Sequence, residues 1–371
     1  MDNKTESPHR RWNPLRQSWV LVSPHRTQRP WQGEVGQKAA PSGVAYDPEC
    51  YLCPGNKRAG GAANPAYDSV FSFVNDYAAL LPDPPAPPAP QASSLLRSMP
   101  ARGLCKVLCY HPDHSLTLAR MTREEIRTVV DAWAREYEEL RAHEWIEYVQ
   151  IFENRGAMMG ASNPHPHGQI WSTGFVPDEP AAETKAQREH LALTGRCLLC
   201  EYLVAEKATS STGPTSAIQG RVIFENDHFA ALVPWWAVWP FEVLLVSRRH
   251  LRAMPELTPD ERDGLADALR RLTTRFDSLF ETSFPYTMGF HQAPTSRAPR
   301  DRSTVAGAGD KSAHEEWHFH AHFYPPLLRS ATVRKFMVGF EMLGMPQRDI
   351  TAETAAQRLR EASEVHFWPR G

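Results

Sequence analysis

The chain lacks several features that mark particular classes of protein. Its 371 residues include only six cysteines, and 41 Lys and Arg nearly balance 43 Asp and Glu, for a formal net charge of −2. A net charge so close to zero provides no electrostatic basis for binding nucleic acid or an anionic membrane. The longest apolar stretch, residues 229–246, is interrupted by Glu242 and two prolines, so it predicts buried strands and not a membrane span.

The first residues also lack the apolar segment of a secretory signal, so a cytoplasmic location is expected. In a reducing compartment, closely spaced cysteines are more often metal ligands or free thiols than disulfides. Two C-x-x-C pairs are present, at residues 50–53 and 197–200. Cys105 and Cys109 lie in a strand-like segment and are expected to be core residues.

Two similar series of motifs follow one another along the chain, which indicates an internal duplication. Residues 73–82 resemble residues 224–234, and each segment follows a C-x-x-C pair. A Thr-x-x-Glu capping box comes next in each series, which predicts that helices begin at Thr122 and at Thr258. Each series ends in a strand-like segment with alternating histidines.

These motifs predict an α+β protein with two pseudo-duplicated halves, residues 1–195 and 196–371. Mostly antiparallel sheet flanked by helices is expected, because the strand-like segments are short and separated by turns. Residues 176–195 and 298–313 are polar, mixed in charge or broken by Gly and Pro, and are expected to be excursions between strands. The expected strands are residues 146–153, 169–175, 221–224, 229–233, 241–247 and 317–324.

The segment with the clearest chemistry is His-Pro-His-Gly-Gln at residues 165–169. Alternate side chains of a strand point to the same face, so His165, His167 and Gln169 would line one side. A neutral imidazole is a good nucleophile for phosphorus near neutral pH, because its pKa lies near 6.5. A neighbouring carboxamide can donate to phosphoryl oxygens without competing as a nucleophile. The alternative is a pair of histidines in a Pro/Gly turn with no reactive role.

Residues 154–169, together with residues 23–33 and 320–339, resemble the galactose-1-phosphate uridylyltransferase family, a branch of the histidine-triad superfamily. The similarity covers nearly the whole chain and implies two histidine-triad-like halves. It also implies a ping-pong reaction of galactose metabolism. His167 would attack the α-phosphorus of UDP-glucose, release glucose 1-phosphate and pass the uridylyl group to galactose 1-phosphate, giving UDP-galactose. Gln169 would hydrogen-bond the transferring phosphoryl group.

The resemblance further implies substrate contacts and a homodimer, and it implies no nicotinamide or flavin cofactor. Arg26 and Arg29 would reach the nucleotide from the other subunit, since a planar guanidinium suits phosphate. The family pattern usually has Tyr where this chain has Phe340, so a hydroxyl contact is missing there. Uridine and phosphate contacts would be Asn75, Asp76, Asn154, Gly160, Ala161 and Ser162. The sugar phosphate would be contacted by Lys335, Phe336, Phe340, Glu341 and Gln347.

The first C-x-x-C pair, Cys50 and Cys53, has the spacing of a zinc site, and thiolates with imidazoles suit tetrahedral Zn²⁺. The resemblance supplies His114 and His165 as the other two ligands. A metal on His165 would stiffen the strand two residues from the nucleophile. The alternative is a pair of reduced, buried cysteines.

A second metal site has two possible ligand sets. The resemblance implies a carboxylate and imidazole set that accepts iron as well as zinc, formed by Glu183, His291, His320 and His322. The internal repeat instead maps the first site onto Cys197, Cys200, His250 and His320. Because His320 belongs to both sets, they cannot both be complete, and we favour the first. Either site would be structural, since the nucleophile lies in the first half.

Two other classes of function remain open. A different histidine-triad nucleotidyltransferase, such as a dinucleoside-polyphosphate phosphorylase or an ADP-forming transferase, would use adenine nucleotides. A zinc-stabilised binding module would bind metal and nucleotide without turnover. The presence of His167 beside Gln169 in a glycine-lined strand argues against that module.

Overall fold

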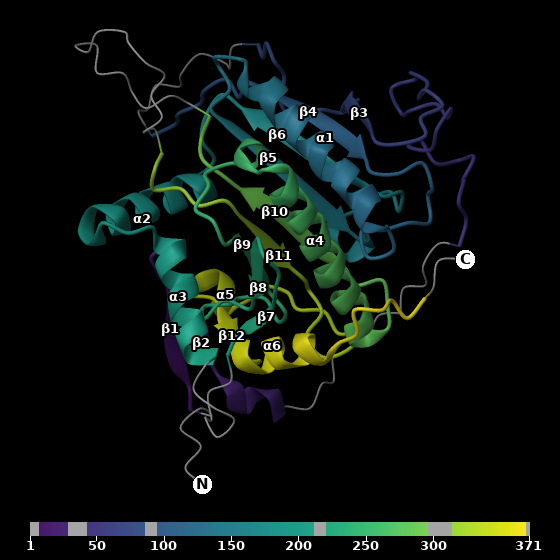
Figure 1. The fold of residues 1–371 in the computed structure, drawn as a ribbon. Helices are drawn as coiled ribbons and strands as arrows, with labels where there is room; N and C mark the ends of the chain where they lie inside the picture. The colour runs from purple at the N-terminus through teal and green to yellow at the C-terminus, as the bar shows by residue number, and fades with distance from the viewer. Residues whose placement is uncertain (1–6, 29–42, 86–94, 211–219, 296–313, 369–371) are drawn as a thin grey trace, which may run out of the picture.

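The computed structural model describes residues 7–28, 43–85, 95–210, 220–295 and 314–368, which form a large sheet, a small sheet and several helices (Figure 1). The strands are β1 (His9–Asn13), β2 (Ser18–Val22), β3 (Phe71–Val74), β4 (Gly103–Cys109), β5 (Tyr148–Arg155), β6 (His167–Thr173), β7 (Val222–Glu225), β8 (Phe229–Leu232), β9 (Val243–Ser247), β10 (Tyr286–His291), β11 (His320–Tyr324) and β12 (Gln347–Arg348). The α-helices are α1 (Arg123–Arg141), α2 (Asp178–Thr194), α3 (Leu198–Ser210), α4 (Pro259–Phe280), α5 (Phe340–Leu343) and α6 (Ala352–Glu361). Short 3-10 helices are η1 (Pro24–Gln28), η2 (Ala157–Met159) and η3 (Met254–Glu256).

The large sheet repeats one arrangement of strands on either side of its centre. Its order is β3-β4-β6-β5-β10-β11-β9-β8-β7, and its neighbouring strands are antiparallel. β5 and β10 are central, β6 and β4 follow on one side, and β11 and β9 follow on the other. Phe152 on β5 pairs with Gln169 on β6, as Gly289 on β10 pairs with His322 on β11. The two halves therefore join edge to edge in one sheet.

Each half contributes one long helix, and α1 and α4 lie side by side across the sheet (Figure 1). Both begin at the predicted capping boxes, where Thr122 and Thr258 accept from the N–H of the Glu three residues later. Pro259 stands at the first helical position, where its missing N–H costs no hydrogen bond. Trp133 of α1 is fully buried and packs on Phe290 of β10. One apolar core thus spans both halves.

The predicted strands are present, with ends shifted by at most three residues. Cys105 and Cys109 are fully buried in β4, as predicted. The excursion predicted over residues 176–195 is wrong, because helix α2 occupies this segment. Residues 298–313, the other expected excursion, lie outside the described residues. Apolar periodicity does not reveal α2, because the buried face of this helix is partly polar. The buried residues have helical spacing and are Pro180, Glu183, Ala186 and Gln187.

Segments from the two ends of the chain form the small sheet. β1 and β2 are antiparallel, and β12 adds to β2 in parallel. In Figure 1 this sheet and α5 lie at the lower end of the molecule, whereas β4 and β6 lie near the top. Among the described residues, no helix combines the length and apolar character needed to cross a membrane.

Candidate active site and metal centres

Strand β6 holds His167 and Gln169 between two neighbouring strands, β4 and β5. Both side chains are partly exposed, and the intervening Gly168 is buried. A Cβ built on Gly168 would lie 2.2 Å from the hydroxyl oxygen of Tyr110 and 2.9 Å from the carbonyl oxygen of Phe152. Only glycine therefore fits here, and its close packing fixes the two candidate catalytic side chains on one face.

A backbone hydrogen bond selects the tautomer of His167. Its Nδ1 lies 2.7 Å from the carbonyl oxygen of His165. Because a carbonyl only accepts, Nδ1 carries the proton and Nε2 keeps its lone pair. Burial lowers the pKa of His167, although the bond to His165 acts in the opposite direction. The ring is thus held neutral with Nε2 available as a nucleophile.

Trp171, which the sequence analysis did not identify, orients the carboxamide of Gln169. The indole Nε1 lies 3.0 Å from Oε1 of Gln169. An indole N–H only donates, so the amide oxygen must face the indole and the amide NH₂ remains free to donate elsewhere. Phe152 packs edge-on against the Trp171 ring. Gln169 therefore offers a donor beside His167, which is what a developing phosphoryl charge requires.

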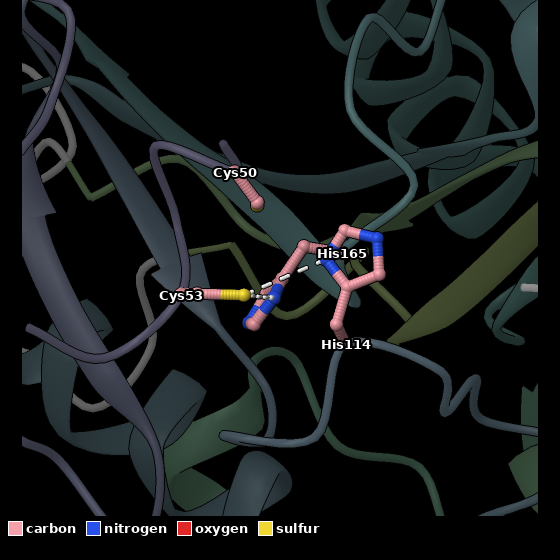
Figure 2. Close-up of side chains that lie close together, drawn as sticks. All are labelled: Cys50, Cys53, His114 and His165. Atoms are coloured by element: carbon pink, nitrogen blue, oxygen red, sulfur yellow. Dashed lines mark hydrogen bonds between the residues drawn. The ribbon is translucent and has the colours of Figure 1, made fainter. Parts of the chain in front are cut away.

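Four side chains from distant parts of the sequence meet beside β6 (Figure 2). All four are buried, and they are the predicted set Cys50, Cys53, His114 and His165. Sγ of Cys53 lies 3.6 Å from Nδ1 of His114 and 3.6 Å from Nδ1 of His165. Ordinary Zn–S and Zn–N bonds in a tetrahedral site separate S and N by about 3.6 Å. Burial raises the pKa of Cys53 to about 11, so a bound cation would be needed to form its thiolate at neutral pH. The set fits zinc.

Two further residues orient these ligands and were not identified from the sequence. The Tyr67 hydroxyl donates to the Leu52 carbonyl oxygen at 2.6 Å, so it accepts from Nε2 of His165 at 3.0 Å. Nδ1 of His165 is then unprotonated and available to a metal. Asn163 accepts from the N–H of His165 at 2.9 Å and donates to Sγ of Cys50 at 3.3 Å. An Asn two residues before a candidate ligand is a recognisable turn signal, whereas nothing in the sequence marks Tyr67.

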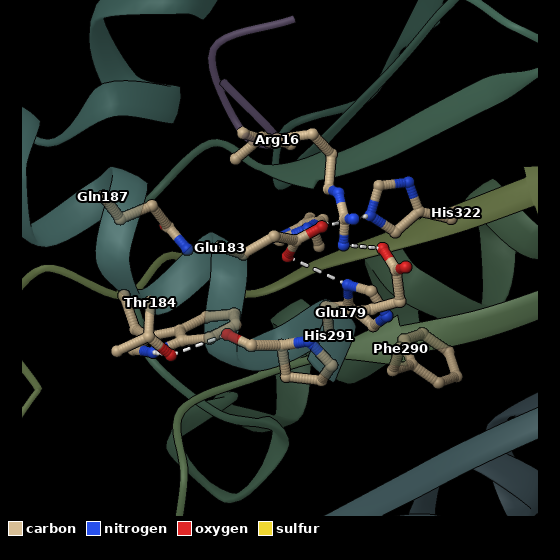
Figure 3. Close-up of polar contacts among 12 residues, drawn as sticks. Arg16, Glu179, Glu183, Thr184, Gln187, Phe290, His291 and His322 are labelled. Atoms are coloured by element: carbon tan, nitrogen blue, oxygen red, sulfur yellow. Dashed lines mark hydrogen bonds and ion pairs between the residues drawn. The ribbon is translucent and has the colours of Figure 1, made fainter. Parts of the chain in front are cut away.

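A second cluster brings α2 against β10 and β11 (Figure 3). It consists of the set that we favoured, Glu183, His291, His320 and His322. The Glu183 carboxylate oxygens lie 2.9 Å from Nδ1 of His291, and 3.3 Å from Nε2 of His320 and of His322. Burial alone would raise the pKa of Glu183, but the three histidines, His291 above all, hold it well below its usual range. A carboxylate with three imidazoles fits iron or zinc.

A third cluster is present that the sequence analysis assembled incorrectly. Cys197, His250 and His318 present their ligand atoms to one another, and Sγ of Cys200 lies 3.4 Å from Nδ1 of His318. The repeat-based set is therefore wrong in one member, since the residue equivalent to His165 is His318 and not His320. The error came from aligning the two histidine strands two residues out of step. With His318 in that place, no residue is shared with the second cluster.

The residues expected to contact uridine and phosphate lie on β5 and on two loops. Asn75 and Asp76 directly follow β3, where Asp76 pairs with Arg58 at 3.5 Å. Asn154 is on β5 and accepts from Thr287 of β10 at 2.9 Å. The remaining three follow η2 and lead towards β6; they are Gly160, whose φ is +77°, Ala161 and Ser162.

The residues expected at the sugar phosphate form a separate group beside the small sheet. Glu341 accepts from Lys335 at 2.7 Å and from the buried Arg348 at 3.1 Å. Phe336 and Phe340 are 59% and 58% exposed, so their rings are free to meet a ligand or another chain. This group lies near α5, at the end of the molecule remote from β6 (Figure 1).

Arg26 belongs to the same end of the molecule. Asp349 accepts from Nε of Arg26 at 3.2 Å and from Nε2 of Gln347 at 2.7 Å, which links two predicted contact residues. Arg29, the other predicted nucleotide contact, lies outside the described residues.

Two joined α+β units, each with a His-x-His strand beside a Cys/His cluster, define a duplicated histidine-triad-like fold. The chain belongs to the galactose-1-phosphate uridylyltransferase family. The family model for the N-terminal domain of galactose-1-phosphate uridyl transferase matches residues 1–177, and the model for its C-terminal domain matches residues 183–370.

Curated relatives cover almost the whole chain. Galactose-1-phosphate uridylyltransferase from Haemophilus influenzae is 50% identical over 369 residues, which are 99% of this chain and 97% of that protein. The enzyme of the same name from Rattus norvegicus is 49% identical over 98% of this chain and 90% of its own length. A solved uridylyltransferase structure is 27% identical, with a TM-score of 0.69 over 96% of this chain and 98% of that chain. An Arabidopsis thaliana ADP-glucose phosphorylase, at 22% identity over 96% of this chain and 100% of that chain, shares the fold with a TM-score of 0.71.

Proposed function

We propose that this chain transfers a uridylyl group from UDP-glucose to galactose 1-phosphate through a covalent intermediate on His167. The observation that carries the proposal is the hydrogen bond from Nδ1 of His167 to the His165 carbonyl oxygen, which leaves Nε2 unprotonated. The names of relatives at 43–50% identity support the choice of substrates.

In the first half-reaction, Nε2 of His167 attacks the α-phosphorus of UDP-glucose. An N–P bond forms, the bond from that phosphorus to the bridging oxygen breaks, and glucose 1-phosphate leaves. The ring becomes cationic, and its Nδ1–H bond to the His165 carbonyl then strengthens because it is charge-assisted. Gln169 donates its amide hydrogens to the phosphoryl oxygens as negative charge develops on them.

In the second half-reaction, a phosphate oxygen of galactose 1-phosphate attacks the same phosphorus. The N–P bond breaks, UDP-galactose leaves, and His167 returns to its neutral form. Because glucose 1-phosphate departs before galactose 1-phosphate reacts, His167 carries the uridylyl group from one substrate to the other. The carboxamide of Gln169 stabilises both transition states without acting as a base towards water.

Two metal centres are part of the proposal. Zinc would be held by Cys50, Cys53, His114 and His165, and it would fix the strand two residues before the nucleophile. Iron or a second zinc would be held by Glu183, His291, His320 and His322. Both ions would be structural, and neither would contact the reacting phosphorus.

We also propose a homodimer in which the group around Arg26 and Lys335 completes the active site of the other subunit. The group lies far from β6 within one chain, yet it exposes two aromatic rings and gathers cationic side chains (Figure 1). Arg26 and Arg29 would bind the nucleotide, and Lys335, Phe336, Phe340, Glu341 and Gln347 the sugar phosphate. The two halves would divide at residue 195, and a reducing cytoplasm would keep the cysteines as ligands.

The proposal is tested by incubating the purified protein with UDP-glucose alone and recording its intact mass. A gain of one uridylyl group with equimolar release of glucose 1-phosphate is expected. His167→Asn should abolish both, and His143→Asn, at an exposed position just after α1, should change neither. An adduct that survives in His167→Asn would overturn the nucleophile assignment.

The same assay separates the alternative functions. An adenylyl adduct from ADP-glucose, with none from UDP-glucose, would indicate an adenine-specific transferase. Tight nucleotide binding without an adduct or product from either sugar nucleotide would indicate a binding module.

A further inference from the structure

We propose that the C-terminal half contains a third metal centre, a zinc site formed by Cys197, Cys200, His250 and His318. None of these residues belongs to the first two clusters, and the proposed transfer reaction does not use them. The site would join three separate segments: the beginning of α3, the turn after β9 and the residues that lead into β11.

The distances suit a tetrahedral ion with two sulfur and two nitrogen ligands. Nδ1 of His318 lies 3.2 Å from Sγ of Cys197 and 3.4 Å from Sγ of Cys200. These values are close to the separation of about 3.6 Å expected between S and N ligands of one zinc ion. The ligand atoms of Cys197, His250 and His318 all lie within 4.8 Å of one another. One small cation can therefore contact these three side chains, and Sγ of Cys200, beside Nδ1 of His318, is placed to become the fourth ligand.

Hydrogen bonds to carbonyl oxygens orient both imidazoles towards the sulfur atoms. Nε2 of His318 lies 2.7 Å from the Ser247 carbonyl oxygen, and Nε2 of His250 lies 2.8 Å from the Trp317 carbonyl oxygen. Each Nε2 must carry a proton, because a carbonyl only accepts, so each Nδ1 is left with a lone pair. Metal-binding histidines commonly have their second ring nitrogen held in this way.

The internal duplication provides an independent argument. The first cluster and this one have the same C-x-x-C pair and the same use of Nδ1 of the first histidine in a His-x-His strand. Two residues later, His167 and His320 each donate from Nδ1 to the carbonyl oxygen of the ligand, His165 and His318 respectively, at 2.7 Å. The two sites are therefore equivalent in the two halves. The third centre would fix His320 as the first fixes His167.

The test measures zinc per chain in the purified full-length protein by elemental analysis. Cys200→Ser and His250→Gln should each lower the zinc content by about one equivalent relative to the unaltered protein. Cys105→Ser is the matched control, because Cys105 is a buried cysteine outside all three clusters. A zinc content unchanged in both site variants would overturn the proposal.

A second measurement needs no variant, so it does not depend on the folding of one. Alkylation of the unreduced protein with and without a chelator, followed by peptide mapping, reports the state of Cys197 and Cys200. Protection of both thiols that is lost after chelation is expected. A disulfide between them, visible as a peptide lighter by two hydrogens, or rapid alkylation before chelation would contradict a metal centre.

Discussion

A His-x-His pair leads into each of two strands, His165 and His167 into β6 and His318 and His320 into β11. The second histidine of each pair makes the same backbone hydrogen bond, yet His167 and His320 lie in different surroundings. Nδ1 of His167 and Nδ1 of His320 each donate to the carbonyl oxygen two residues earlier, at 2.7 Å. Both rings therefore present Nε2. His167 is partly exposed, whereas His320 has no exposed surface and its Nε2 lies 3.3 Å from Glu183.

The difference arises from neighbours and not from the histidines themselves. The position after His167 on the same face holds Gln169, a neutral donor, whereas the equivalent position after His320 holds His322, a potential ligand. Helix α2 adds Glu183 over β11 (Figure 3). One strand thus presents a free nucleophile and the other a metal ligand, from one shared tautomer.

Replacing each histidine in turn should give the largest effect. His167→Asn is expected to lower the rate of uridylyl transfer by about 10⁴-fold or more, because no other group can form the covalent intermediate. His320→Asn should lose metal from the Glu183 cluster but still form the uridylyl adduct. Transfer rate, adduct mass and metal content are measured for both. An active His167→Asn protein together with an adduct-free, folded His320→Asn protein would reverse the two roles.

Breaking a buried ion pair between the two halves should have the next largest effect, a loss of stability. Arg155 on β5 pairs with Asp277 on α4 at 2.8 Å, and both side chains are buried. Arg155→Ala would remove the guanidinium from a buried carboxylate that keeps only His366 and the N–H of Phe284 as further partners, so a loss of about 3–5 kcal/mol of unfolding free energy is expected. Urea denaturation measures it. The exposed pair of Arg141 with Glu138 provides the control, and Arg141→Ala should cost less than about 1 kcal/mol. Equal losses of unfolding free energy in the two variants would refute a stabilising role for the buried pair between the halves.

Removing the carboxamide from β6 should have a smaller effect that is confined to catalysis. Gln169→Ala is expected to slow adduct formation by about 10²–10³-fold, because one preorganised donor to the phosphoryl oxygens is lost. Rapid quenching of the reaction with UDP-glucose alone measures this step. An unchanged rate would mean that the phosphoryl group does not contact Gln169.

Releasing the carboxamide without removing it should have the smallest effect. Trp171→Phe keeps an aromatic ring against Phe152 but loses the indole N–H, so the Gln169 amide is free to turn over. Loss of one such hydrogen bond corresponds to about a tenfold slower transfer. The transfer rate is measured for Trp171→Phe in the native protein and in Gln169→Ala, which isolates the hydrogen bond between the two side chains. An equal loss of rate in both proteins would show that Trp171 does not act through Gln169.

Local signals in the sequence predicted most of the fold. The capping boxes at Thr122 and Thr258 define helix starts through side-chain hydrogen bonds within one turn, so no tertiary information is needed. Helix α2 was missed because its buried face contains Glu183 and Gln187. Glu183 is buried against His291 of β10, and Gln187 against His318 just before β11; hydrophobic periodicity does not report such contacts.

In the candidate site, too, some residues could be predicted from the sequence and others could not. Cys50 and Cys53 were predicted from their spacing, the other ligands of the first two clusters were predicted by a resemblance over long motifs, and the structure brings each set together. His318 was misassigned because the histidine spacing is two throughout residues 318–322, so the repeat alone does not determine the alignment. Tyr67 and Trp171 were missed because each acts through one hydrogen bond whose partner is defined only in the folded chain.

The central claim is that Nε2 of His167 is the unprotonated nucleophile. The most direct test is ³¹P NMR of the trapped uridylyl intermediate on protein with ¹⁵N-labelled histidine, combined with peptide mapping of the adduct. The account predicts one phosphoramidate, on residue 167, with phosphorus coupled to Nε2. Phosphorus on Nδ1, on another residue, or on no residue at all while transfer proceeds would contradict it.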